Sequence, residues 1–153
     1  QLASGKFLMI GRGKNKKSMA YIGNIVVFLQ ACIASDLKYG VFNYVDTPDL
    51  TINELVSQVR RTLKNKDGVG LRLPYWLGMI LGYIADSIAK LTGKNLPVSS
   101  IRVKKFASST EFQSCKDDLD NFTPPFTLGE GIARTLHSEF IAPDPRLEIF
   151  HTE

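Results

Sequence analysis

The chain is poor in the residues that form disulfides and metal sites. Of its 153 residues, two are cysteines and two are histidines. Cys32 and Cys115 lie far apart, each in a segment with helical spacing, which argues against a disulfide framework or a thiolate metal site. His137 and His151 have no carboxylate or cysteine at metal-ligand spacing. We therefore expect no metal ion, and the cysteine usage favours a reducing cytosol.

Long hydrophobic runs are also absent. The longest apolar stretch, Tyr75–Ala89, is too short to cross a bilayer and contains Asp86 near its end. No signal-peptide pattern is present. The sequence therefore predicts a cytoplasmic location and no membrane partner.

The chain has a mild excess of positive charge, and this charge is clustered. The formal net charge is +4 and the sequence pI is about 9.1. The cations gather in three places, at Lys14–Lys17, Arg60–Lys66 and Arg102–Lys105. Separate clusters fit a discrete anionic ligand better than nucleic acid, which usually meets a longer basic stripe. Because RNP, zinc-finger and basic-helix patterns are absent too, we predict no nucleic-acid partner.

The stretch FLMIGRGKNKKSMAYIGN, Phe7–Asn24, places glycines and four cations between two apolar runs. That pattern is typical of a loop beside a phosphate. However, Gly11-Arg12-Gly13 lacks the rest of a dinucleotide fingerprint, and no Gly-Lys-Ser/Thr ending follows. On spacing alone, a nucleotide-binding loop and a glycine-rich hairpin with exposed lysines both remain open.

The first half of the chain predicts short strands and two helices. Short strands are expected at Phe7–Ile10 and Met19–Tyr21, on either side of the basic loop. Apolar residues recur at helical spacing over Asn24–Ala34, so a largely buried helix is expected there. Val41–Val45 is β-branched and aromatic, which predicts another strand. A capping box then starts a helix that should end at a turn signal, and the two motifs are Thr51-Ile52-Asn53-Glu54 and Asp67-Gly68.

The second half predicts mainly helices. After an extended piece at Leu71–Pro74, a long helix should run over Tyr75–Leu91 and stop at Gly93, with Gly78 and Gly82 allowing another element to approach closely. Shorter helical pieces are expected from Ser99 or Ser100 to Phe106 and over Ser114–Leu119. A second capping box, Thr127-Leu128-Gly129-Glu130, should open a last helix that turns Ile132, Leu136 and Phe140 inward. From its residues alone, the chain is a helix-rich α/β domain with a basic loop and no catalyst.

Several phrases, taken in order, resemble the C-terminal half of the extended short-chain dehydrogenases/reductases, the family of nucleotide-sugar epimerases, dehydratases and reductases. Residues 1–11 resemble the helix end, small strand and glycine that precede the family's substrate loop. Ser18–Ile25 is similar to its "R-D-[FY]-[IV]-x-V-x-D-[LV]" segment, and Val41–Val45 to its "xFN[IV]G" strand. Phe122–Ile132 resembles its "LG[WF]-x-P-x-x-[ST]-L-x-E-G[IL]" ending.

The resemblance implies that this chain is part of a larger enzyme. The family's GxxGxxG cofactor turn and its YxxxK catalytic pair are both absent. The chain alone is therefore expected to bind no cofactor and to hold no catalytic residue. The N-terminal half of the same gene product would supply both and would bind NAD(P). Because the chain starts at Gln1, in what reads as the end of a helix, it is expected to be a fragment.

The resemblance also implies a domain organisation. Residues 1–142 would form the helix-rich C-terminal substrate lobe of a Rossmann-type enzyme, including the last strand and helix of the parent sheet. Residues 143–153 would be a loose C-terminal tail. An exposed strand edge at Val41–Val45 would favour a homodimer.

The resemblance further implies positions for a nucleoside-diphosphate sugar. The backbone of Leu8, Met9 and Ile10 would lie along the nucleotide base. Lys17 takes the place of the family's diphosphate-binding arginine, and as a point charge it lacks the guanidinium's two-pronged geometry. The second basic group would lie near Arg102, Lys104 and Lys105. For these residues, the charged outer face of an amphipathic helix is an equally open reading.

Three functions follow from these features. The first is the substrate-binding part of an NAD(P)-dependent nucleoside-diphosphate-sugar epimerase or dehydratase. The second is the same lobe of a 4-keto-sugar reductase or of an enzyme resembling 3β-hydroxysteroid dehydrogenase, which the apolar Tyr75–Leu91 helix would suit. The third is a non-enzymatic interaction module. The upstream sequence separates the third from the others, and substrate profiling separates the first two.

Overall fold

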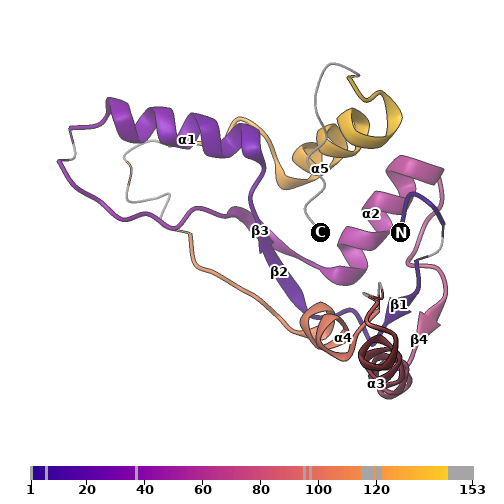
Figure 1. Cartoon of the computed structure of the whole chain (residues 1–153). Coiled ribbons are helices and arrows are strands. Elements are labelled where there is room, and N and C mark those ends of the chain that lie inside the picture. The colour runs from indigo at the N-terminus through magenta and orange to yellow at the C-terminus, as the bar shows by residue number, and fades with distance from the viewer. Residues whose placement is uncertain are drawn as a thin grey trace.

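The computed structural model describes residues 2–5, 7–36, 38–94, 96, 98–114, 119 and 122–144. Helices predominate over a few short strands (Figure 1), as predicted. The strands are β1 (Met9–Ile10), β2 (Lys16–Met19), β3 (Asp46–Thr51) and β4 (Arg72–Leu73). The helices are α1 (Ile22–Ala34), α2 (Ile52–Lys64), α3 (Tyr75–Thr92), α4 (Ser100–Ala107) and α5 (Leu128–Leu136), with a π-helical turn at His137–Ile141.

The strands form two separate pairs on either side of the basic loop. Parallel β1 and β4 place Met9 opposite Arg72, and antiparallel β2 and β3 place Lys16 opposite Thr51. The predicted strand at Met19–Tyr21 therefore lies earlier, at β2. It ends there because the Tyr21 amide donates to the Asp46 carboxylate at 2.6 Å instead of to a neighbouring strand.

The predicted strand at Val41–Val45 is wrong, because this segment is irregular. A strand needs a hydrogen-bonded neighbour, and the part of the chain that the structure describes pairs none with these residues. The strand begins one residue later, at Asp46, where β2 supplies the partner. Val41 is correspondingly 80% exposed.

The core beneath the basic loop is built by β1 and α2. Met9, Ile52 and Val56 are buried together, and Leu2, Phe7, Leu55, Val69 and Phe106 pack against them. The predicted capping box is present, because the Thr51 hydroxyl accepts from the Glu54 amide and the Glu54 carboxylate accepts from the Thr51 amide. The helix ends at Lys64, earlier than predicted, because Asn65 takes the left-handed conformation.

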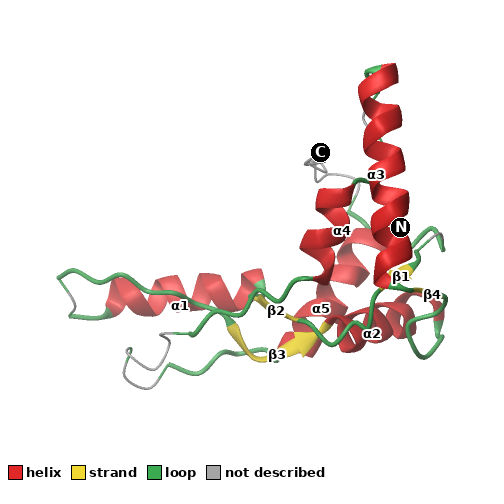
Figure 2. Ribbon diagram, turned by 90° about the horizontal axis from the view of Figure 1, so that it is seen from below, coloured by secondary structure: helices red, strands yellow, loops and turns green. Residues whose placement is uncertain are grey.

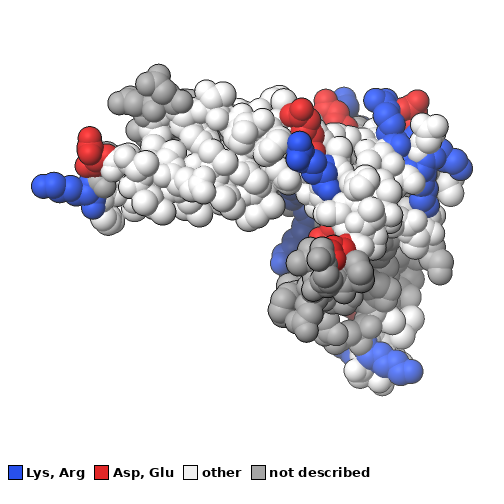
Figure 3. All heavy atoms as spheres, turned by 90° about the horizontal axis from the view of Figure 1, so that it is seen from above, with Lys and Arg blue, Asp and Glu red and all other residues white. Residues whose placement is uncertain are grey.

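Helix α1 contradicts the prediction that it is largely buried. Only Asn24 and Phe28 are buried, whereas Ile22 is 65% exposed and Ile33 is 85% exposed. The helix contains no charged residue. On the side that Figure 3 shows, the described part of the arm that α1 forms has charged side chains only near its tip and where it joins the rest of the molecule. An uncharged apolar face of this kind is unusual for a surface helix.

A buried polar cluster fastens α1 to the rest of the molecule. The Asn24 side chain donates to the Asp46 carboxylate and to the Phe126 carbonyl, both at 2.8 Å, and accepts from the Phe126 amide. The Tyr44 hydroxyl donates to the same carboxylate. Burial of Tyr44, together with this bond, raises the pKa of its hydroxyl well above the usual range. Tyr44 therefore stays a hydrogen-bond donor at any physiological pH.

Helices α3 and α4 pack side by side and project from the rest of the molecule (Figure 2). The long helix, its end at left-handed Gly93 and the Ser99 cap of α4 are all as predicted. Gly78 and Gly82 provide the predicted close approach. A Cβ on Gly78 would lie 2.7 Å from the Ile10 side chain, and one on Gly82 would lie 2.7 Å from the Ser100 backbone.

Helix α5 begins at the second predicted capping box, where the Thr127 hydroxyl accepts from the Glu130 amide. Leu136 is buried as predicted, but Phe140 is 56% exposed because the chain leaves the α-helix for the π-helical turn before it reaches that residue. The predicted helical piece at Ser114–Leu119 and the predicted tail fall largely outside the described residues.

Candidate anion-binding site

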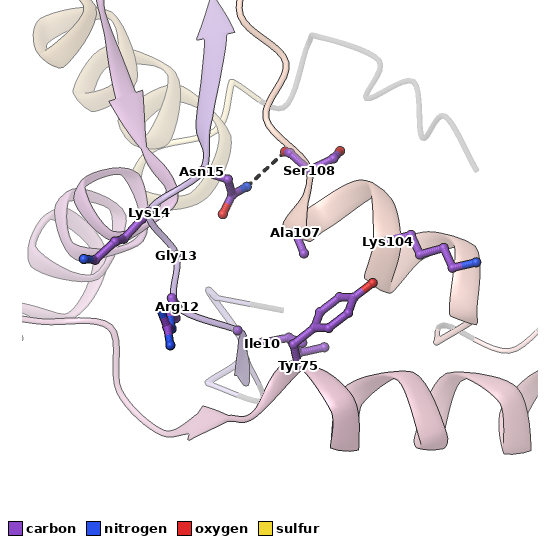
Figure 4. Close-up of a pocket in the computed structure, with 10 residues that line it drawn as sticks. Ile10, Arg12, Gly13, Lys14, Asn15, Tyr75, Lys104, Ala107 and Ser108 are labelled. Atoms are coloured by element: carbon purple, nitrogen blue, oxygen red, sulfur yellow. Dashed lines mark hydrogen bonds between the residues drawn. The ribbon is translucent and has the colours of Figure 1, made fainter.

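The basic loop forms one wall of a cavity of about 410 Å³. The N-terminal end of α3 and the C-terminal end of α4 form the other walls (Figure 4). The ten residues around it are Ile10, Gly11, Arg12, Gly13, Lys14, Asn15, Tyr75, Lys104, Ala107 and Ser108. The cavity therefore joins three segments that are far apart in the sequence.

The carbonyls of the loop are held by fixed donors. The Arg72 guanidinium donates to the carbonyls of Gly11 and Arg12, and its other arm donates to the Asn53 side chain at 3.0 Å. The Asn53 side chain donates to the Arg12 carbonyl, and the Asn53 backbone N–H donates to the Gly13 carbonyl, both at 3.0 Å. These bonds give the loop one conformation and occupy the acceptors that would repel an anion.

Asn15 fixes the opposite wall. Its side-chain amide donates to the Phe106 carbonyl at 2.8 Å and to the Ser108 carbonyl at 3.1 Å. Both acceptors are at the end of α4, where helix carbonyls lack partners within the helix. The loop and α4 are thereby held at a constant separation.

The rim of the cavity is cationic. Arg12, Lys14 and Lys104 lie on it, and none of the ten lining residues is acidic. Within the described part of the chain, no carboxylate forms an ion pair with these three cations. In Figure 4, the Tyr75 ring points into the space between the loop and α4, and Lys14 and Lys104 extend to either side. The arrangement suits a polyanion, because flexible lysines can turn toward phosphate oxygens.

A second, more apolar cavity adjoins the first. It measures about 290 Å³ and lies between β1 and α4. Ile10 lines both cavities. The other lining residues of the second cavity are Phe7, Leu8, Val98, Arg102, Val103 and Phe106. A cationic cavity and a mostly apolar one thus share Ile10 as a lining residue.

The structure brings some of the predicted site residues together and separates others. Leu8, Ile10 and Arg102 share the second cavity. The Met9 side chain instead lies fully buried in the core. The Lys17 ammonium donates to the Lys105 carbonyl at 3.0 Å and to the Thr110 hydroxyl at 3.1 Å. Lys17 and Lys105 are therefore neighbours outside both cavities, and their role toward the diphosphate stays a prediction.

Sequence reasoning missed several residues of the site. Arg72 and Asn53 hold the loop, and Asn15 and Tyr75 shape the cavity, yet none was predicted. Arg72 and Tyr75 lie in a segment that the sequence predicted only as an extended connection and the start of a helix. No local pattern marks these residues, because each acts on a segment distant in sequence.

Two absences among the described residues bear on the kind of site. Among the residues that the structure describes, no group of three or more His, Cys, Asp or Glu side chains could hold a metal ion. Over the same residues, no helix has the length and apolar character needed to cross a membrane.

The sequence of the chain is closely similar to that of a sugar epimerase. The chain belongs to the nucleotide-sugar epimerase family of extended short-chain dehydrogenases, as predicted. The relative is named N-acetyl-alpha-D-glucosaminyl-diphospho-ditrans,octacis-undecaprenol 4-epimerase, from Escherichia coli O157:H7. The two sequences are 49% identical over 142 residues, which is 92% of this chain and 43% of the relative. The chain corresponds to the C-terminal part of that protein.

No protein-family model matches the chain. No solved structure matches it either.

Proposed function

We propose that this chain is the substrate-binding part of an NAD(P)-dependent epimerase that acts on sugar diphosphates. The observation that carries the proposal is the 49% identity to a protein named as a 4-epimerase of a sugar linked to a diphosphate. The cationic cavity at the basic loop supports it, because a diphosphate needs fixed positive charge and an acid-free wall.

NAD(P) would be held outside this chain. The sequence has neither the glycine-rich cofactor turn nor the YxxxK pair. When bound, the nicotinamide accepts and returns a hydride at a sugar carbon. The part played by this chain is to hold the substrate still, with the diphosphate at the rim formed by Arg12, Lys14 and Lys104.

The second cavity would hold the group on the far side of the diphosphate. The family resemblance favours a nucleoside there, stacked along Leu8–Ile10, whereas the relative's name gives a polyprenol. Both groups would suit apolar walls. The sugar diphosphate is the chemistry that they share, and the experiment below separates them.

The test is calorimetric titration of the complete gene product and of this chain. The ligands are UDP-N-acetylglucosamine and N-acetylglucosamine diphosphate carrying a short polyprenyl chain. Replacing Lys104 by alanine should weaken binding about tenfold, since a charge-assisted contact contributes about 1.5 kcal/mol. Lys38→Ala, which removes an equal charge from an exposed position away from the cavity, should change nothing. Lys17→Ala tests the residue that the resemblance implies.

Each result has a defined meaning. Loss of affinity in Lys104→Ala alone places the diphosphate in the cavity, and loss in Lys17→Ala alone places it at β2. Preference for one of the two ligands identifies the far group. If the complete gene product binds neither ligand, the sugar-diphosphate proposal is wrong.

A further inference from the structure

Helix α3 carries a wide apolar face that no described element covers. Its exposed residues include Trp76 at 64%, Tyr83 at 53%, Ile84 at 51% and Leu91 at 86%. Ile80, Leu81 and Ile88 are each between 45% and 47% exposed. At 100° per residue these side chains share one broad side of the helix, opposite the side where Gly78 and Gly82 are buried.

The exposed face contains no charged side chain except Lys90 at its edge, two turns after Tyr83. The two charged residues of α3 are Asp86 and Lys90. Asp86 faces α4, where its carboxylate accepts from the Ser100 amide at 3.1 Å. Lys90 lies in the last turn. A helix that merely faced water would place its charges on this side.

The two aliphatic hydroxyls at the exposed side, those of Ser87 and Thr92, are satisfied within the helix. The Ser87 hydroxyl donates to the Tyr83 carbonyl at 2.9 Å, and the Thr92 hydroxyl donates to the Ile88 carbonyl at 2.8 Å. These hydroxyls need no water to complete a hydrogen bond. The face can therefore enter an apolar medium without leaving those donors unpaired.

Cations and aromatic rings border this face. Lys90 and Lys94 lie at the C-terminal end, and Trp76 and Tyr83 bring amphipathic rings. Amphipathic helices in the membrane interface show this combination, in which the lysines reach anionic headgroups and the rings sit at the boundary. Because α3 is not apolar enough to cross a membrane and packs on α4 along one side, it would lie along the surface.

The anion-binding cavity opens at the beginning of the same helix, because Tyr75, the first residue of α3, lines it. The relative's named substrate joins a diphosphate to undecaprenol. In such a molecule the apolar tail is in the bilayer and the diphosphate is at its surface. A helix lying on the bilayer would bring the cavity to the depth of the headgroups.

We infer that the exposed face of α3 docks on the surface of a lipid bilayer and presents the cavity to a membrane-anchored sugar diphosphate. The inference rests on the proposed function for the identity of the substrate, but its physical basis is the α3 face itself. The sequence predicted no membrane partner because it has no spanning segment, but a helix that lies in the membrane interface needs none. The remainder of the proposed parent protein is a less suitable occupant, because α1 offers it a separate uncharged face on another arm of the molecule (Figures 1 and 2).

The experiment is vesicle co-sedimentation of the complete gene product. The probes are vesicles of phosphatidylethanolamine and phosphatidylglycerol, with phosphatidylcholine vesicles as the uncharged comparison. The test variant combines Ile80→Glu with Ile84→Glu. The control combines Gln113→Glu with Thr123→Glu, which adds the same charge at exposed loop positions.

We expect the wild type and the control to sediment with the anionic vesicles, and the α3 variant to lose at least about tenfold in partitioning. The variant should keep the wild-type melting temperature and the wild-type affinity for UDP-N-acetylglucosamine or inorganic pyrophosphate. Retained affinity separates this inference from the proposed function, which fails only if the complete gene product binds neither UDP-N-acetylglucosamine nor the polyprenyl-linked sugar diphosphate.

Three results would overturn the inference. One is a wild-type protein that does not sediment with vesicles, and another is an α3 variant that sediments as well as the control. The third is that the wild type does not bind vesicles while the α3 variant has a lowered melting temperature or a changed oligomeric state. That result would mean that protein, and not lipid, covers the face.

Discussion

Gly13 links the basic loop to the core beneath it. It is buried, with a φ of 67°, and a Cβ there would collide with the Met9 methyl and the Asn53 side chain. The Asn53 amide also donates to its carbonyl. The loop can lie this close to α2 only because residue 13 has no side chain.

Gly13→Ala should therefore destabilise the protein by about 3 kcal/mol or more, because the left-handed conformation costs about 1–2 kcal/mol and the collision adds to it. Urea unfolding of this chain measures the loss. Gly68→Ala is the matched control, since Gly68 has a similar φ of 73° but open space around it. It should lose only the conformational cost, about 1–2 kcal/mol. An equal loss of unfolding free energy in the two variants would show that the loop shifts to accommodate the added methyl group.

The two capping boxes are the clearest local signals in the chain. In both, a carboxylate accepts from the amide three residues earlier, at Thr51 for Glu54 and at Thr127 for Glu130. These backbone hydrogen bonds, more than the accompanying hydroxyl bonds, hold the pKa of each carboxyl below its usual value of 4.5. Each carboxylate thus stabilises the start of its helix in the charged form.

The direction of these pKa shifts predicts a loss of stability in acid. The stabilisation is complete above the unfolded pKa, near 4.5, and is lost as the pH falls through the lower folded pKa. Replacing both Glu54 and Glu130 by glutamine should make the free energy of unfolding less dependent on pH in this range. Urea titrations at pH 7 and at about pH 3 test it, with Glu139→Gln, a glutamate outside the boxes, as the control. An unchanged pH dependence in the double variant would contradict the assignment.

At the scale of the whole molecule, α1 exposes an apolar face of the kind that is usually buried. Its exposed residues Ile22, Val26, Leu29 and Ile33 recur at helical spacing, and the helix has no charge. The relative extends well beyond the region that this chain matches. We propose that the remainder of the parent protein, including its Rossmann sheet, covers this face.

This proposal predicts opposite behaviour in two contexts for Val26→Glu. In this chain alone, Val26 is 46% exposed, so the change should leave the free energy of unfolding within about 0.5 kcal/mol and reduce self-association. In the complete gene product, it should bury an unpaired charge and lower the melting temperature by at least about 5 °C. Sedimentation velocity and thermal unfolding are the measurements, with Thr123→Glu as the control. A complete protein unaffected by the change would show that α1 faces solvent.

Local structure was largely predictable, and its boundaries show why. The starts of α2 and α5 and the end of α3 depend on hydrogen bonds or backbone angles within a few residues, at Thr51, Thr127 and Gly93. The β-branched run Val41–Val45 was misjudged because strand formation depends on a neighbour that propensity does not describe. For the same reason, the burial of α1 was wrong, since periodicity shows an apolar face but not what covers it.

By itself, the sequence determined the order and ends of most helices, the basic loop and the epimerase-family resemblance, because each is a pattern of neighbouring residues. Only the tertiary structure decided which cations surround a cavity, since that cavity depends on contacts such as Asn15 to Phe106 and Arg72 to Gly11. It also showed that α3 is packed on one side and bare on the other. Such contacts join residues 60 to 90 or so positions apart, and no local pattern encodes them.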